Sequence, residues 1–350
     1  MFFSIFFILL PFTRAFQPSI RKTNLIPPIF TTVKSKSNDF MKLIRPQSIL
    51  PTSLLCFSGG FMMNPSILGL LQTPSFIIST VNTILIMSSS MVINDIFDIE
   101  NDRINSPHRP LVTGVISVKE AVVFFIGLLS LTEFLNMRFL SPHLQNIVHL
   151  SIINILLYTP IYKKIPFIKN VFCAFMVAFS LFFSGLSATK GLIELNPGFN
   201  IFSVALSIIF FGSWYNEVLL DMGDIEGDRE NRIYTIPVLY GVKYAWIFSS
   251  FLLFFNILSN SLSLYYLFGR NTALGLPFIF SPIVYHHWKV YRLKYTRLVM
   301  KDAVNNMRKS LFGLVLFLCG LSIMQSGNVF PTLNWNRDIH WLHIATTVFI

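Results

Sequence analysis

Charged residues are scarce in this chain. Asp, Glu, Lys and Arg make up 12% of its 350 residues, whereas a soluble domain usually carries about 25%. Hydrophobic residues make up 53%, and the mean hydropathy is +0.62. This composition excludes an ordinary soluble protein and leaves no length for a separate soluble domain, so we expect one integral membrane domain.

Cysteine is also rare, and its positions exclude a disulfide or metal framework. Cys56, Cys173 and Cys319 lie far apart inside apolar runs and have no ligand or disulfide spacing. The formal net charge of +11 does not indicate nucleic acid as a partner, because the basic residues lie between apolar runs and near the N-terminus. That distribution fits membrane topology instead.

Apolar runs of about 20 residues recur along the chain, each long enough to cross a bilayer as a helix. We therefore predict an all-α fold, a multi-span transmembrane helical bundle. Its helices, about nine in number, are expected near residues 47–70, 74–94, 115–136, 144–162, 168–188, 199–220, 243–267, 272–288 and 309–326.

The N-terminal residues have the composition of a targeting sequence. A short apolar segment at 2–11 precedes a stretch rich in Ser, Thr and Pro, with no acid before Asp39. A signal peptide followed by a transit-like stretch resembles the two-part plastid presequences of algae whose plastids came from a eukaryotic endosymbiont. We predict a plastid membrane location, with a plain secretory signal as the alternative. The chain then divides into a signal/transit-like presequence at 1–38, a membrane domain at 39–326 and a C-terminal tail at 327–350.

Basic residues predict which connections share a membrane side. Alternate connections are rich in them, and the intervening ones hold only Arg138, Lys190 and Arg270. By the positive-inside rule the rich set faces the cytoplasm or the stroma. The rich set comprises Arg103 and Arg109, then Lys163, Lys164 and Lys169, then Arg229, Arg232 and Lys243, and finally the residues from Lys289 to Lys309.

The few acidic residues gather in two matched clusters, each at the end of an apolar run. Both have the spacing i, i+3, i+7, which on a helix places three carboxylates on one face. Both fall on the side rich in basic residues, so we expect them to face each other across one opening. The first cluster comprises Asp95, Asp98 and Asp102, and the second comprises Asp221, Asp224 and Asp228.

Carboxylates beside hydrocarbon are costly and indicate a functional site. Because their like charges repel, a cation between them is favoured. Mg²⁺ prefers oxygen ligands and completes its shell with water and phosphate, so two facing clusters would hold roughly two such ions around a diphosphate. Arg109 could clamp that diphosphate, and Lys163 and Lys169 could add point charges. The alternatives are that the acids only cap solvated helix ends and that these bases only anchor topology.

At these residues the chain resembles the UbiA-type intramembrane prenyltransferase superfamily, over about residues 40–325. The segment from Tyr158 to Asn170 and the pair Arg45-Pro46 also resemble family segments. The resemblance is carried chiefly by Asn94-Asp95-x-x-Asp98-x-x-x-Asp102, by Arg109-Pro110-Leu111-Val112-x-Gly114 and by Asp221-x-x-Asp224-x-x-x-Asp228.

This resemblance implies a helical bundle with a polar cap over a central cavity. It implies an enzyme in which metal-assisted loss of diphosphate gives an allylic cation that an aromatic or lipid acceptor attacks. The expected partners are a polyprenyl diphosphate, that acceptor and membrane lipids. The resemblance implies that the diphosphate is bound by Asn94, Arg109, Lys163, Lys169 and Asn170. It implies that Mg²⁺ is bound by Asp95, Asp98, Asp102, Asp221, Asp224 and Asp228. The residues implied for catalysis are Asp98, Asp224 and Asp228.

The branch of the superfamily is less sharply indicated. Ile104-Asn105-Ser106-Pro107 departs from the 4-hydroxybenzoate and haem O branches and is closer to the homogentisate, chlorophyll-synthase and geranylgeranylglyceryl-phosphate branches. We favour a homogentisate or quinone-type acceptor, with chlorophyllide or a glycerol-phosphate lipid as alternatives. Asn216 and Leu220 stand where related branches often have basic residues, and Arg232 stands where Gly is common.

A different class of protein could use the same acids. The alternative is an ion-coupled secondary transporter whose two acidic clusters coordinate its ions. Transporter sites usually lie near the bilayer midplane on interrupted helices, whereas these clusters end their helices beside basic connections. The sequence therefore favours the prenyltransferase.

Overall fold

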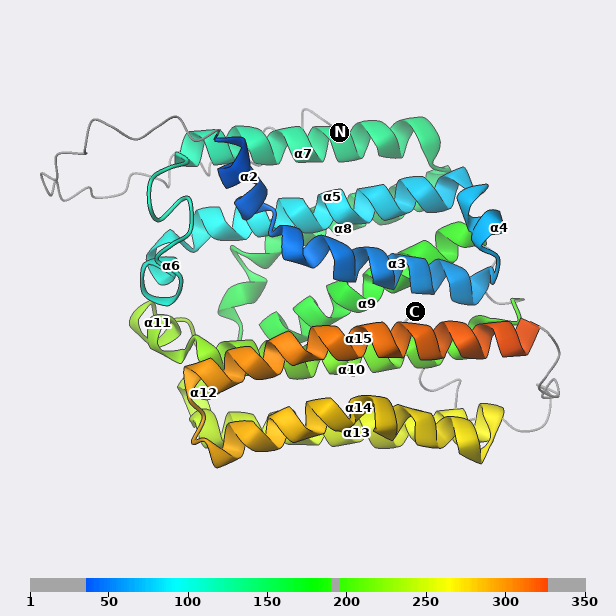
Figure 1. Cartoon of the computed structure of the whole chain (residues 1–350). Coiled ribbons are helices and arrows are strands. Elements are labelled where there is room, and N and C mark those ends of the chain that lie inside the picture. The colour runs from blue at the N-terminus through cyan, green and yellow to red at the C-terminus, as the bar shows by residue number, and fades with distance from the viewer. Residues whose placement is uncertain (1–35, 190–195, 327–350) are drawn as a thin grey trace, which may run out of the picture. The chain divides into compact units, whose positions relative to one another are not determined.

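The computed structural model describes residues 36–189 and 196–326, which belong to one unit beginning at Lys36. This part of the chain is helical and contains no strand (Figure 1). The predicted tail at 327–350 and nearly all of the predicted presequence lie outside the described residues.

Within the described residues, helices occupy all the predicted positions. They are α3 (Ile49–Met63) with α4 (Ile67–Leu71), α5 (Pro74–Phe97), α7 (Val118–Phe139), α8 (Pro142–Tyr158), α9 (Ile168–Ala188), α10 (Phe199–Gly223), α13 (Val242–Phe268), α14 (Arg270–Arg292) and α15 (Arg297–Ser326). The first predicted span is divided, because the helix stops between Met63 and Ile67.

Five of the described helices are long and apolar enough to cross a membrane: α5, α9, α10, α13 and α15. At 15 and 17 residues, α3 and α8 are shorter than the usual span of about 20. Large apolar side chains are exposed on the outer helices, among them Phe278 at 80% and Leu258 at 68%. The protein is thus an integral membrane protein, and the count of about nine spans stays a prediction.

The remaining elements are short: α2 (Ser37–Leu43), η1 (Pro46–Ser48), α6 (Ile99–Asn105), η2 (Tyr162–Lys164), α11 (Ile225–Glu230) and α12 (Ile236–Tyr240). In Figure 1, α6, α11 and α12 lie at one end of the helices and α4 lies at the other. The connections rich in basic residues therefore share one end. The prediction that both acidic clusters lie on one side is confirmed.

The local sequence explains where the long helices begin. Pro74 and Pro142 stand in the first turns of α5 and α8, where a missing N–H costs no helical hydrogen bond. Ser117 and Glu120 form a reciprocal capping box at the start of α7, which satisfies two backbone donors. These signals set the entry points on both sides of the bundle.

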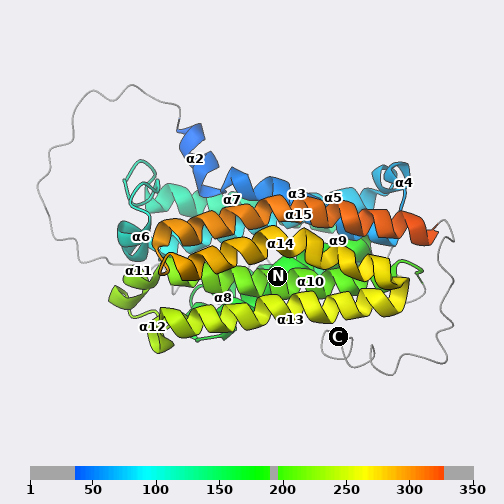
Figure 2. The same ribbon diagram turned by 60° about the horizontal axis from the view of Figure 1, so that its bottom comes forward.

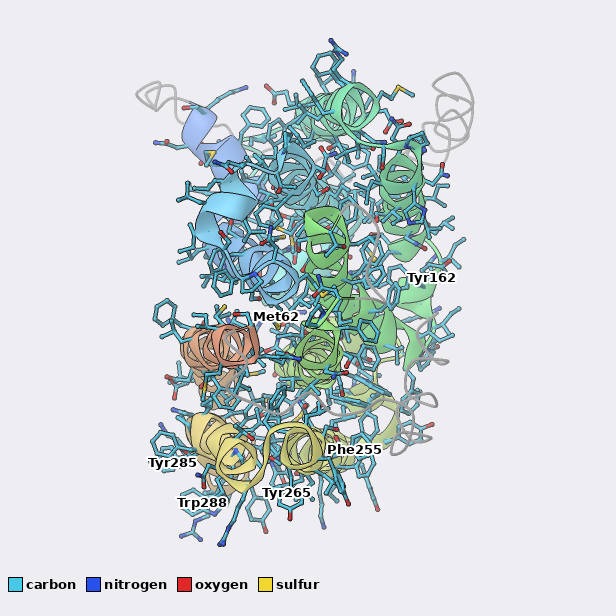
Figure 3. All side chains as sticks on the ribbon, turned by 90° about the vertical axis from the view of Figure 1, so that its right-hand side faces the viewer. Met62, Tyr162, Phe255, Tyr265, Tyr285 and Trp288 are labelled. Atoms are coloured by element: carbon cyan, nitrogen blue, oxygen red, sulfur yellow. The ribbon has the colours of Figure 1, made fainter. Side chains whose placement is uncertain are left out.

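Helix α10 packs against α3, α9, α13 and α15 and contributes Phe202 and Tyr215 to the main buried cluster. Helices α13 and α14 form an adjacent pair (Figure 2), and Figure 3 shows the side chains in a view along the helices. A Cβ on Gly59 would overlap the Leu181 carbonyl oxygen, so α3 and α9 approach closely only because this position is glycine. Small residues serve membrane helix contacts in this way.

Candidate functional site

Each acidic cluster lies where a long helix breaks into a short one. Asp98 separates α5 from α6 with φ −96° and ψ 9°, and Asp224 separates α10 from α11 with φ −109° and ψ 11°. The continuous helix implied by the spacing is therefore wrong at the middle aspartate of each cluster. These dihedrals lie in the bridge region of backbone space.

The break keeps the carboxylates of each cluster together. The Asp102 N–H donates to the Asp98 carbonyl at 2.7 Å, and the Asp228 N–H donates to the Asp224 carbonyl at 3.0 Å. Helical i to i+4 hydrogen bonds thus continue through each break and preserve the approximate helical register.

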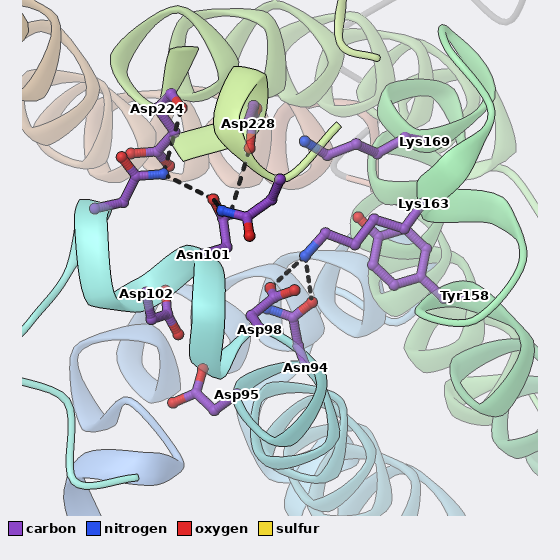
Figure 4. Close-up of polar contacts among 12 residues, drawn as sticks. Asn94, Asp95, Asp98, Asn101, Asp102, Tyr158, Lys163, Lys169, Asp224 and Asp228 are labelled. Carbon is purple, nitrogen blue, oxygen red and sulfur yellow. Dashed lines mark hydrogen bonds and ion pairs between the residues drawn. The ribbon is translucent and has the colours of Figure 1, made fainter. Parts of the chain in front are cut away.

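The two clusters meet through α6 and α11. Asn101 Nδ2 donates to Asp228 Oδ1 at 3.3 Å (Figure 4), and Asn105 Nδ2 donates to the Asp224 carbonyl at 3.3 Å. A Cβ on Gly227 would lie 2.6 Å from Asn101 Oδ1 and nearer still to the Asn105 amide. With any larger residue at 227, the Asn101 and Asn105 side chains would have to move for the two short helices to stay in contact.

A cavity of about 520 Å³ extends from the clusters into the bundle. Its polar end is lined by Asp98, Asp102, Asp221, Asp224 and Asp228, and Ile86, Phe179 and Phe183 belong to its apolar part. On α9, Lys169 and Phe183 are separated by fourteen residues, about 21 Å along the axis. One cavity is thus charged at one end and apolar inside.

Basic side chains from other segments hold the first cluster. Arg109 Nη1 lies 2.7 Å from Asp95 Oδ1 and 2.5 Å from Asp102 Oδ2, and Arg45 Nη2 lies 2.7 Å from Asp95 Oδ1. Lys163 donates to Asp98, as Figure 4 shows. Sequence reasoning missed Arg45 as a site residue, although the pair Arg45-Pro46 was part of the family resemblance.

The second cluster is held in the same manner. Lys169 donates to Asp221, and Asn170 Nδ2 donates to Asp221 Oδ2 at 2.8 Å. The predicted diphosphate-binding residues Asn94 and Lys163 are also joined, at 3.4 Å. All the predicted site residues therefore lie in or beside one polar site, and their individual roles stay predictions.

Besides Arg45, three residues in or beside this site were not predicted. Arg297 Nη2 lies 3.4 Å from Asp224 Oδ1 and 2.7 Å from the Asn105 carbonyl oxygen, and Lys301 lines the cavity one turn further along α15. Glu217 lines it from α10. The only sequence signals were a basic connection, attributed to topology, and one acid inside an apolar run.

The electrostatics of the short helices favour a bound cation. Burial raises the pKa of Asp102 to about 7 and that of Asp228 to about 6. Asp228 Oδ2 is buried and has no hydrogen-bond partner within residues 36–189 and 196–326. A nearby positive charge favours the ionised form of such carboxylates.

The donor set fits a hard divalent ion. Carboxylate and amide oxygens are the ligands that Mg²⁺ accepts. In the described residues, no three His, Cys, Asp or Glu side chains already converge on one point, because most of the aspartates pair with Arg or Lys. The residues for metal binding are present. Their Arg and Lys partners must move away before all of these aspartates can coordinate a metal ion.

Fold and site together define an integral membrane helical bundle with one amphipathic cavity, whose polar end carries carboxylates and cations from two matched helix breaks. The model of the UbiA prenyltransferase family matches residues 53–301. The chain belongs to this family and is a prenyltransferase. The ion-coupled transporter alternative gains no support.

Among its relatives is a digeranylgeranylglyceryl phosphate synthase of Methanococcus maripaludis. It is 31% identical over 249 residues, which cover 70% of this chain and 81% of the relative. Another synthase with this name, from Sulfurisphaera tokodaii, is 25% identical over 250 residues, covering 70% of this chain and 84% of its own length.

Solved structures share the fold. A structure described for digeranylgeranylglyceryl phosphate synthase superposes with a TM-score of 0.60 at 23% identity, covering 82% of this chain and 99% of that one. A UbiA homolog from Archaeoglobus fulgidus bound to GPP and Mg²⁺ gives a TM-score of 0.57 at 18% identity, covering 79% and 99%.

Proposed function

We propose that the protein transfers a polyprenyl group from its diphosphate to the hydroxyl of a glycerol-phosphate lipid, with Mg²⁺ as cofactor. The observation that carries this proposal is the meeting of both aspartate clusters at the polar end of a cavity that continues into apolar helices. Such a cavity suits a molecule with a diphosphate at one end and a hydrocarbon chain at the other.

The six motif aspartates would hold the metal, with Asp98, Asp224 and Asp228 the closest to the reaction. When bound, Mg²⁺ would offset the charge of the leaving diphosphate. Asn94, Arg109, Lys163, Lys169 and Asn170 would bind the diphosphate oxygens. Lys163 and Lys169 now donate to Asp98 and Asp221, so they can exchange a carboxylate for a phosphate oxygen by a side-chain rotation.

The apolar part of the cavity would take the prenyl chain. Phe179 and Phe183 stack with ring centroids 6.2 Å apart, and with Ile86 they belong to its lining. Hydrocarbon is stabilised by removal from water there. About 21 Å of α9 beside the cavity allows several isoprene units.

The acceptor is proposed from the relatives. Their name describes a glyceryl phosphate bearing two geranylgeranyl groups, which supports a prenylated glycerol phosphate as acceptor and geranylgeranyl diphosphate as donor. Our preference from sequence for a homogentisate or quinone-type acceptor gains no support from these relatives. Lys301 agrees with an anionic headgroup, because in the described residues it lines the cavity without a carboxylate partner.

The test is a transfer assay on the full chain in proteoliposomes. Labelled geranylgeranyl diphosphate is supplied with Mg²⁺ or EDTA and with geranylgeranylglyceryl phosphate, homogentisate or chlorophyllide. We expect a Mg²⁺-dependent product with the glycerol-phosphate lipid. If product forms only with homogentisate or only with chlorophyllide, the proposed glycerol-phosphate acceptor is wrong. If no product forms with any acceptor, the proposed activity is wrong.

We also propose, from sequence alone, that residues 1–38 direct the protein to a plastid membrane. The compared relatives are archaeal and lend this location no support. Fusion of these residues to a fluorescent protein in an alga with such plastids tests it. Plastid fluorescence is expected, and fluorescence confined to the secretory pathway would contradict it.

A further inference from the structure

Glu217 is an acid within a membrane-spanning helix that belongs to neither aspartate motif. It precedes Asp221 by one turn on α10, and both side chains line the cavity. Since α10 runs toward the aspartates, Glu217 lies about 6 Å deeper along the helix axis than Asp221. A carboxylate at such a place is expensive and indicates function.

The surroundings of Glu217 differ from those of the motif aspartates. Asp98, Asp221 and Asp224 each pair with a Lys or Arg. In the part of the chain that the structure describes, Glu217 forms no ion pair, and Lys169, whose charge acts on it, donates to Asp221 instead. Its carboxylate is therefore not committed to a cation.

Its hydrogen-bonding neighbours are uncharged. Cys173 is the side-chain hydrogen-bond partner of Glu217, and Cys173 Sγ donates to Tyr158 Oη at 3.0 Å. The Tyr158 ring stacks on Phe172 with centroids 5.6 Å apart. These contacts orient Glu217 in the cavity wall and leave it able to take up a proton.

We propose that Glu217 is a catalytic residue, the general base that takes the proton from the acceptor hydroxyl. This inference rests on the proposed prenyl transfer. With the diphosphate among the aspartates and the prenyl chain in the apolar part, the carbon that carries the diphosphate lies at the boundary, beside Glu217. The acceptor hydroxyl must reach the same carbon.

The step balances without a further reactant. The acceptor oxygen forms a bond to the first prenyl carbon, and the bond from that carbon to the diphosphate oxygen breaks. The diphosphate leaves with the electron pair of that bond. The hydroxyl proton goes to the Glu217 carboxylate, from which it returns to water after product release.

The experiment separates proton transfer from donor ionisation. Full-length wild type, Glu217→Gln and Glu217→Asp are compared in proteoliposomes with Mg²⁺. One readout is transfer to the glycerol-phosphate lipid. The other is exchange of a bridging ¹⁸O label into the non-bridging positions of geranylgeranyl diphosphate, measured with an acceptor analogue that lacks the hydroxyl. Glu133→Gln is the matched control, because Glu133 is a buried acid in α7 that pairs with His149 and does not line the cavity.

We expect Glu217→Gln to lose transfer by about 100-fold or more, as is typical for removal of a general base, while isotope exchange and donor affinity stay within about twofold. Glu217→Asp should retain partial transfer, which shows that the carboxylate matters even if the glutamine variant folds poorly. Transfer by Glu217→Gln at the wild-type rate, or equal losses of exchange and transfer, would overturn the role as base. Absence of both readouts in wild type would instead refute the proposed function.

Discussion

At the scale of single residues, the site is a set of paired charges drawn from distant parts of the chain. Arg109 bridges Asp95 and Asp102, whereas Arg297 reaches Asp224 from α15. Buried charges are tolerable when paired in this way. Binding of a metal and a diphosphate would exchange these partners without leaving a charge uncompensated.

Magnesium affinity should fall as the pH falls. The raised pKa values of Asp102, about 7, and Asp228, about 6, mean that each carboxylate keeps its proton to higher pH than an exposed acid. A metal ligand must lose that proton, so affinity drops as pH falls through these values and levels off above them. Calorimetric titration of the full chain should show at least about tenfold weaker Mg²⁺ binding at about pH 5.5 than at about pH 8. Equal affinities would contradict this.

Lys301→Ala should weaken acceptor binding selectively. Loss of a charged contact costs about 1.5–3 kcal/mol, so KM for the glycerol-phosphate lipid should rise about tenfold or more with kcat and the donor KM little changed. Lys164→Ala is the control, because Lys164 is exposed at the same end and does not line the cavity. An unchanged KM for the acceptor would show that Lys301 does not bind the headgroup.

At the scale of elements, the decisive features are the matched helix breaks and the close contact of α6 with α11. The spacing of the aspartates predicted that the three carboxylates of each cluster lie together, but it did not predict the helix breaks. Helical periodicity carries no information about a change in the backbone dihedral angles of a single residue such as Asp98 or Asp224. The need for glycine at 227 was equally invisible, since it depends on Asn101 and Asn105, which lie more than a hundred residues earlier.

Gly227→Ala should separate α6 from α11. The added methyl would collide with the Asn101 and Asn105 amides, and shifting one short helix moves Asp228 away from the first cluster. We expect Mg²⁺-dependent donor binding to weaken by about tenfold or more, since displaced catalytic groups can cost about 100-fold in rate. Gly127→Ala on α7, where an added Cβ would meet no atom of the described residues within 4 Å, should bind the donor normally. Undiminished donor binding in Gly227→Ala would argue against the contact.

Arg232→Gly should stabilise the protein. Arg232 is exposed and has a φ of 57°, which is unfavourable for a residue with a Cβ by about 1–2 kcal/mol. After the entropic cost of Gly, a gain of about 0.5–1 kcal/mol remains. Thermal unfolding in detergent should show a higher Tm for Arg232→Gly and a lower one for Arg229→Gly in α11. A lower Tm for both variants would contradict the proposed backbone strain at Arg232.

At the scale of the whole molecule, hydropathy and the charges of the connections predicted the helix positions and the common end of both clusters. Hydropathy did not predict the helix boundary where a helix extends beyond its apolar residues into a polar segment. The last span was expected from 309, but α15 begins at Arg297, because its first turns are polar. This extension brings Arg297 to Asp224 and Lys301 to the cavity, so hydropathy could not predict these two site residues.

The central claim is that both aspartate clusters form one Mg²⁺-dependent diphosphate site. The most direct measurement is the affinity of the full chain for a non-reactive thio analogue of geranylgeranyl diphosphate, with Mg²⁺ and with EDTA, in wild type, Asp98→Asn and Asp224→Asn. The account predicts binding that needs Mg²⁺ and weakens by about tenfold or more in each variant. Tight binding in EDTA, or full affinity in either variant, would contradict a shared site.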